Sequence, residues 1–172
     1  MTAVAYLSID PATRRWIHAV SPSYVEQVPI GAVMEAGAVG RVTASEHPGF
    51  AVGDHVYGAF GVQDFACSDG TGVTKLAPLL APLPTYLGPL GVTGLTAYFG
   101  LLEIGRLNEA DTVVVSGAAG AVGSVAGQIA KIKGCRLISR EDVLEGSARA
   151  LPEACPKLFA GENTGKLMLA VQ

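Results

Sequence analysis

The residues with the clearest chemical meaning form a glycine-rich segment at 116–123, Ser-Gly-Ala-Ala-Gly-Ala-Val-Gly. A sharp turn from a strand into a helix brings backbone amides close to a phosphate group. Gly120 would let the backbone approach such a ligand, and Gly123 would let the helix pack tightly on the strand. Ala118 replaces the first glycine of the usual G-x-G-x-x-G pattern, and Gly117 stands just before it. The segment predicts a dinucleotide pyrophosphate site; the alternative is a turn that only allows packing.

The residues around this segment predict one βαβ unit. Residues 111–116 are an apolar, β-branched run that is typical of a buried parallel strand. A second strand is expected at 135–138. Between them, apolar residues recur at helical spacing up to a glycine cap. These helix positions are Val122, Val125, Ile129 and Ile132, with the cap at Gly134.

Upstream, a further helix is expected from about Thr93 to a stop at Gly105. Its apolar residues share one helical face: Leu95, Tyr98, Phe99 and Leu102. A proline-rich connector at 78–89 precedes it. The first hundred residues otherwise consist of short strand patterns and breakers, with a tight turn at Gly53, and predict a partly open β-barrel or sandwich.

Composition narrows the class of protein. The 172 residues carry a net charge of −3, which gives no basic face for nucleic acid. Three cysteines, an odd number without close spacing, indicate reduced thiols.

The first residues lack a signal-peptide pattern, so the expected location is cytoplasmic. Residues 112–130 are uncharged and about long enough to span a membrane, but their β-branched start favours a strand, and no membrane partner is expected.

Five segments together resemble a known family. They are residues 6–11 with Arg14, 53–58, 94–103, 115–124 and 159–166. They resemble the zinc-independent medium-chain dehydrogenases/reductases, and within them the prostaglandin reductase, leukotriene B4 dehydrogenase and alkenal double-bond reductase group with its curcumin reductase-like members.

The resemblance implies an α/β fold, α+β overall, with a GroES-like barrel and a Rossmann domain. It implies NADP(H) as cofactor and reduction of the carbon–carbon double bond of a small enone or alkenal. It places Gly120, Ala121, Val122 and Gly123 at the cofactor pyrophosphate. Residues Asn163 to Gly165 would form a loop that returns to the cofactor, and Thr96 would lie in the helix near the nicotinamide. No catalytic residue is assigned, and relatives are commonly homodimers.

A full Rossmann domain of βα units needs roughly 150 residues, and this chain supplies one unit. The sequence therefore looks spliced between Ile138 and Ser139, and it also lacks the first barrel strands of the family. The expected domains are a GroES-like part at 1–90 and 139–172, with a helix at 146–160 and a strand at 165–171, and a partial Rossmann part at 91–138.

A metal site is not expected. Zinc-dependent members of the superfamily carry Gly-His-Glu near residues 35–42, but no histidine follows Gly37 here. The three histidines, His18, His47 and His55, have no partner at ligand spacing. Two functional alternatives stay open: a non-catalytic remnant or dimerisation module, and a quinone oxidoreductase.

Overall fold

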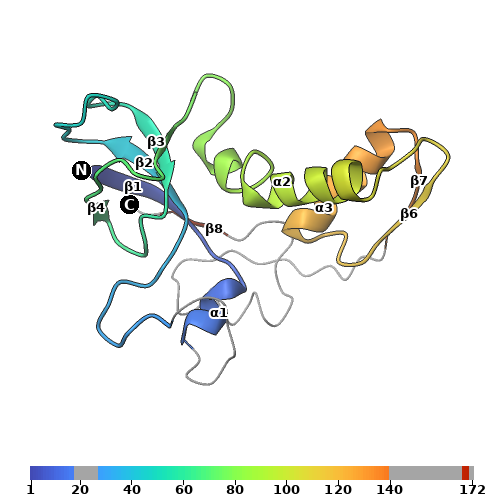
Figure 1. The fold of residues 1–172 in the computed structure, drawn as a ribbon, viewed down its shortest axis with the longest axis horizontal. Coiled ribbons are helices and arrows are strands. Elements are labelled where there is room, and N and C mark those ends of the chain that lie inside the picture. Colours follow the sequence, from blue (N-terminus) through green and yellow to red (C-terminus); the bar gives the residue numbers. More distant parts are fainter. Residues whose placement is uncertain (18–26, 140–167, 171–172) are drawn as a thin grey trace.

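The computed structural model describes residues 1–17, 27–139 and 168–170. An antiparallel sheet lies at one end of the molecule and a small parallel sheet with its helix at the other, joined by a helical segment (Figure 1). The elements up to this joining segment are β1 (Thr2–Ser8), α1 (Ala12–Ile17), β2 (Ala38–Val42), β3 (His55–Gly58), β4 (Phe65–Ala66), β5 (Thr74–Lys75) and the 3₁₀ helix η1 (Leu83–Leu87). The others are α2 (Val92–Tyr98), the π-helix η2 (Phe99–Ile104), β6 (Thr112–Val115), α3 (Ala121–Ile132), β7 (Arg136–Ser139) and β8 (Met168–Ala170).

The larger sheet has the strand order β4-β1-β2-β3-β5, and β8 also pairs with β1. Its ladders are antiparallel throughout. Gly40 lies in the middle of β2, where a Cβ would overlap the carbonyl oxygen of Ala3 on β1, so the close approach of these strands requires glycine. The expected turn at Gly53 is present, with φ of +99°. The mixed α/β structure with an antiparallel sheet confirms the predicted fold class.

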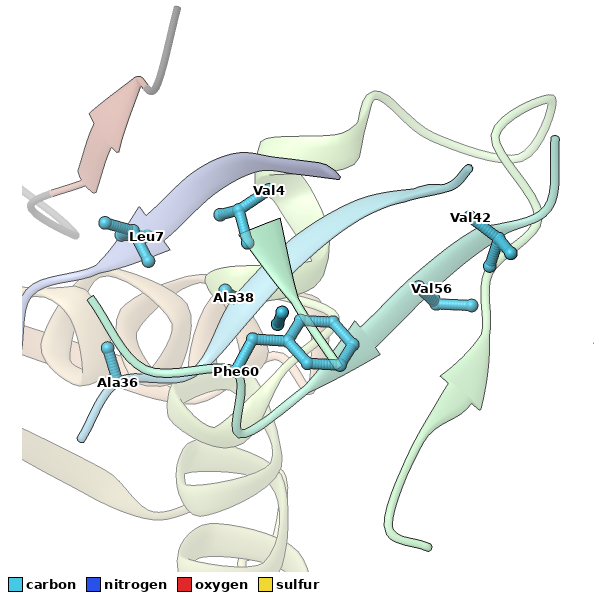
Figure 2. Close-up of a cluster of buried hydrophobic side chains, with 8 residues drawn as sticks. Val4, Leu7, Ala36, Ala38, Val42, Val56 and Phe60 are labelled. Carbon is cyan, nitrogen blue, oxygen red and sulfur yellow. The ribbon is translucent and has the colours of Figure 1, made fainter. Parts of the chain in front are cut away.

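The core of this sheet consists of aliphatic side chains from successive strands and one aromatic ring (Figure 2). The members are Val4, Leu7, Ala36, Ala38, Val42, Val56, Phe60 and Ala66. The Phe60 ring lies where a Cβ on Gly58 would come within 2.8 Å of its Cε1 and Cζ atoms. Buried and partly buried residues alternate along β3 and along most of β1, so that one face of the sheet is covered by this core.

The predicted helix from Thr93 to Gly105 is confirmed in extent, as α2 continued by η2 with Gly105 at the C-cap. Its apolar residues are nevertheless not a buried stripe, since Leu95 and Phe99 are each 53% exposed. The buried residues of α2 are Gly94 and Ala97. A Cβ on Gly94 would overlap the carbonyl oxygen of Pro89, so the helix packs against the connector through its smallest residues.

The predicted βαβ unit is confirmed. Strands β6 and β7 pair in parallel with α3 as the crossover between them. Ser139, which we expected beyond the splice, is the last residue of β7 and pairs with Val115. The strand at β6 also rules out one helix across 112–130, and among the described residues no helix is both long and apolar enough to cross a membrane.

The predicted strand at 165–171 is represented by β8, which pairs antiparallel with β1 from Tyr6 to Ser8. The predicted helix at 146–160 lies outside the described residues.

Candidate functional site

The glycine-rich segment forms the turn between β6 and α3. Gly117 adopts a left-handed conformation with φ of +62°, which favours glycine. The amide of Gly120 donates a hydrogen bond of 2.8 Å to the Gly117 carbonyl and closes the turn. Gly120 is the N-cap of α3, with extended backbone and no side-chain capping bond. The chain therefore leaves strand geometry at Gly117 and enters the helix at Ala121.

Gly123 has a more specific packing role than the sequence indicates. A Cβ on Gly123 would overlap the Gly117 carbonyl oxygen and come within 3.0 Å of the Ala118 Cα. It therefore allows the first helical turn to pack on the backbone of the loop that follows β6. Gly127 lies at the contact between the helix and the sheet, where a Cβ would lie 3.3 Å from Cδ2 of Leu137 on β7. The sequence offers Gly127 as the end of a small-xxx-small pattern that begins at Gly123, and assigns it no packing role in the βαβ unit.

The start of α3 has the electrostatic character of an anion site. The first intrahelical acceptor is Gly120, whose carbonyl receives the amide of Ser124 at 2.9 Å. The amides of Ala121, Val122 and Gly123 precede that bond and lie at the positive end of the helix dipole. The first turn contains no acidic residue, and Val122 is 37% exposed. A negatively charged group can thus approach this end of the helix from the solvent.

The other predicted site residues are placed as follows. Thr96 lies on α2, and its hydroxyl donates a hydrogen bond of 2.7 Å to the Val92 carbonyl. Its neighbour Ala97 packs with Ala126 of α3 in one apolar cluster, so α2 and α3 lie against each other. Asn163 and Gly165 lie outside the described residues.

Two adjoining clefts separate the larger sheet from α2. Their volumes are about 430 and 350 Å³, and Tyr57, Tyr86 and Val92 line both. The Tyr86 hydroxyl donates a hydrogen bond of 2.7 Å to the Ala77 carbonyl. We did not predict this pair of tyrosines, because one lies on β3 and the other on η1, and only the folded chain places them together.

His47 has a local structural role. Its Nδ1 accepts a hydrogen bond of 3.0 Å from the Gly49 amide, and its ring lies 5.2 Å from that of Phe50. Within residues 1–17, 27–139 and 168–170 there is no group of three histidine, cysteine or acidic side chains suited to a metal ion.

Comparison with known proteins relates this geometry to a family. Residues 1–76 match the family described as the N-terminal domain of oxidoreductase. The NADPH-dependent curcumin reductase of Escherichia coli is 46% identical over 133 residues, which are 77% of this chain and 38% of that protein. Prostaglandin reductase 1 of Mus musculus is 43% identical over 136 residues, or 77% of this chain and 39% of the relative.

A solved structure extends the likeness to almost the whole chain. CurA from Vibrio vulnificus, crystallised in complex with NADPH, is 40% identical with a TM-score of 0.74, and the match covers 96% of this chain and 47% of CurA. The chain thus spans about two fifths of the length of the curated relatives named above. Over the residues that these comparisons cover, the chain belongs to the zinc-independent medium-chain dehydrogenase/reductase family, as its motifs predict.

Proposed function

We propose that this chain binds NADPH and that the whole protein reduces the carbon–carbon double bond of α,β-unsaturated ketones or aldehydes. The observation that carries the proposal is the start of α3, where an uncapped N-terminus follows a left-handed glycine. A diphosphate is the ligand class that such a turn suits best. The E. coli relative is an NADPH-dependent reductase and CurA was crystallised with NADPH, which supports the same cofactor.

The proposed roles of the residues follow from their positions. The amides of Ala121, Val122 and Gly123 would hold the pyrophosphate, and Gly120 would leave room for it because it has no side chain. Thr96, Asn163 and Gly165 are proposed to lie along the remainder of the cofactor. When bound, NADPH supplies the hydride for the β-carbon of the double bond. The protein's part is to orient the two reactants and to exclude water.

Calorimetric titration of the 172-residue chain with NADPH tests the cofactor site. We expect micromolar binding. Gly120→Ala should weaken it about tenfold, since its new methyl group would lie 3.1 Å from the Gly117 carbonyl oxygen and narrow the approach to the amides. Gly100→Ala is the matched control, because a Cβ there meets nothing within 4 Å. Equal binding by the Gly120 variant, or no binding by the native chain, would contradict the proposed site.

Loss of NADPH absorbance in the presence of cyclohexenone tests the activity of the whole protein. Turnover that requires both compounds supports the reductase. A preference for quinones in the same assay would instead favour the quinone oxidoreductase alternative.

A second candidate function is a binding or dimerisation module without turnover. It is favoured by the parallel sheet, which has two strands within the described residues and leaves Val114 on β6 72% exposed. This candidate expects self-association in sedimentation experiments and NADPH binding without oxidation by an enone. This candidate is ruled out if the 172-residue chain oxidises NADPH in the presence of an enone.

The proposed setting is the cytoplasm, with a homodimer as the assembly. Cys67 is an exposed free thiol and Cys135 a buried one, which is typical of a reducing compartment. Cell fractionation and size-exclusion chromatography test these two points.

A further inference from the structure

The larger of the two clefts is built from elements far apart in the chain. The end of β1, the residue before β2, the strand β3 and the start of α2 all contribute to it. The side chains that line it are mainly apolar or aromatic: Pro11, Ala12, Trp16, Tyr57, Tyr86, Leu87 and Val92. Its volume of about 430 Å³ is that of a site for a small organic ligand.

Gly37 lies beside the Tyr57 ring in this cleft. A Cβ on Gly37 would lie 3.4 Å from the Tyr57 hydroxyl oxygen and 3.6 Å from Cε2 of the ring. The space beside the phenol is therefore kept open by the missing side chain. Gly37 belongs to the same stretch, 35–42, in which zinc-dependent members carry a ligand.

The two tyrosines of the cleft differ in one respect. The Tyr86 hydroxyl already donates to the Ala77 carbonyl at 2.7 Å. The Tyr57 hydroxyl makes no hydrogen bond with any residue in the described ranges, and Tyr57 is half-buried. A phenol whose donor is unused in a mainly apolar cleft gains most from a ligand with an acceptor oxygen.

We propose that Tyr57 is a specificity-determining residue whose hydroxyl donates a hydrogen bond to the carbonyl oxygen of the ligand. The hydrocarbon part of the ligand would lie along Trp16, Leu87 and Val92. Asp10, which accepts a hydrogen bond from the Ser8 hydroxyl, lines the same cleft and disfavours a carboxylate there. The identity of the ligand as an enone rests on the proposed function; the role of Tyr57 rests on the geometry above.

The chain provides its own probe for the test. Trp16 is the single tryptophan among 172 residues, and it lines this cleft. Its fluorescence is titrated with cyclohexenone and with cyclohexene, without NADPH, and free N-acetyltryptophanamide corrects for collisional quenching. Tyr57→Phe should raise the Kd for cyclohexenone about fivefold and leave that for cyclohexene unchanged. Tyr98→Phe removes the same hydroxyl group from a residue that is 45% exposed and lines neither cleft, so it is the matched control and should leave both Kd values unchanged.

Three outcomes would overturn the proposal: no saturable change with cyclohexenone in the native chain, an unchanged Kd in Tyr57→Phe, or an equal loss of affinity in Tyr98→Phe. If Tyr57→Phe does not fold, Gly37→Val replaces it, because the added side chain would press on the phenol ring. That variant should weaken cyclohexenone binding while Gly37→Ala does so less. NADPH is absent from these titrations. A negative result for Tyr57 therefore does not count against the NADPH site, and a negative result in the NADPH titration does not count against the role of Tyr57.

Discussion

The two halves of the molecule bury different kinds of side chain. In the antiparallel sheet, large aliphatic residues such as Val39 and Val56 are completely buried. In the βαβ unit and α2, the buried residues are mostly small, chiefly Ala97, Ala126 and Ala130 beside Val115 on β6, whereas Val114 is 72% exposed and Ile132 82% exposed. The sheet thus supplies its own hydrophobic core, while the second half gains mainly from close backbone packing.

This difference indicates which kind of substitution should destabilise each half. A region stabilised by buried aliphatic side chains loses free energy when a side chain is shortened. A region that packs through glycine and alanine loses it when a side chain is added. The predictions below test this contrast, from the largest expected effect to the smallest.

The largest effects are expected from adding a methyl group where backbones touch. Gly40→Ala and Gly123→Ala each place a Cβ on top of a carbonyl oxygen, that of Ala3 and of Gly117 respectively. Each should destabilise its own half by about 3 kcal/mol or more. Hydrogen exchange should show lost protection in the antiparallel sheet for Gly40→Ala and around α3 for Gly123→Ala.

Gly117→Ala is the control for that pair. A Cβ there meets nothing within 4 Å, so the penalty comes from its φ of +62° alone and should be about 1 kcal/mol. If Gly123→Ala were no worse than this control, the close contact between α3 and its preceding loop would be unimportant for stability.

Shortening side chains should affect the two halves differently. Val56→Ala removes methyl groups from a fully buried position and should lower the free energy of unfolding by about 2 kcal/mol. Val114→Ala, at a position that is 72% exposed on β6, should change it by less than about 0.5 kcal/mol. Urea unfolding followed by circular dichroism measures both, and similar losses would mean that Val114 is covered in solution.

The smallest effect concerns the edge of the sheet next to Gly53. A hydrogen bond of 2.8 Å from the Ala51 amide and an ion pair of 2.6 Å with Lys75 hold the pKa of Asp54 below its ordinary value of 3.8. A lowered pKa in the folded state stabilises the fold above pH 3.8, and this contribution is lost as the pH falls through the folded-state pKa.

Asp54→Asn should therefore be less stable than the native chain at neutral pH, with the difference disappearing in acid. Lys75→Met should lose less, because the Ala51 hydrogen bond remains. Thermal unfolding between neutral and acidic pH follows both variants. A larger loss in Lys75→Met would make the ion pair, and not the turn, the main cause.

The sequence predicts the local geometry of the second half well, because the β-branched run before Ser116, the glycines and the helical spacing all agree. It does not predict burial there: Leu95 and Phe99 share a helical face as expected but are exposed, since spacing reports a shared face and not what covers that face. The cleft between Tyr57 and Tyr86 could not be foreseen, because it depends on how η1 and α2 lie against β3. The positions of Asn163 and Gly165 stay predictions.

The pairing of β1 has a consequence for the biosynthesis of the protein. This strand precedes β8 by most of the sequence, yet part of its length pairs with β8, from Tyr6 with Ala170 to Ser8 with Met168. During translation, β1 can pair with β2 and β4 before β8 is synthesised. Until then the side of Tyr6–Ser8 that β8 will cover has no partner strand, and an unpaired strand edge is open to pairing with another chain.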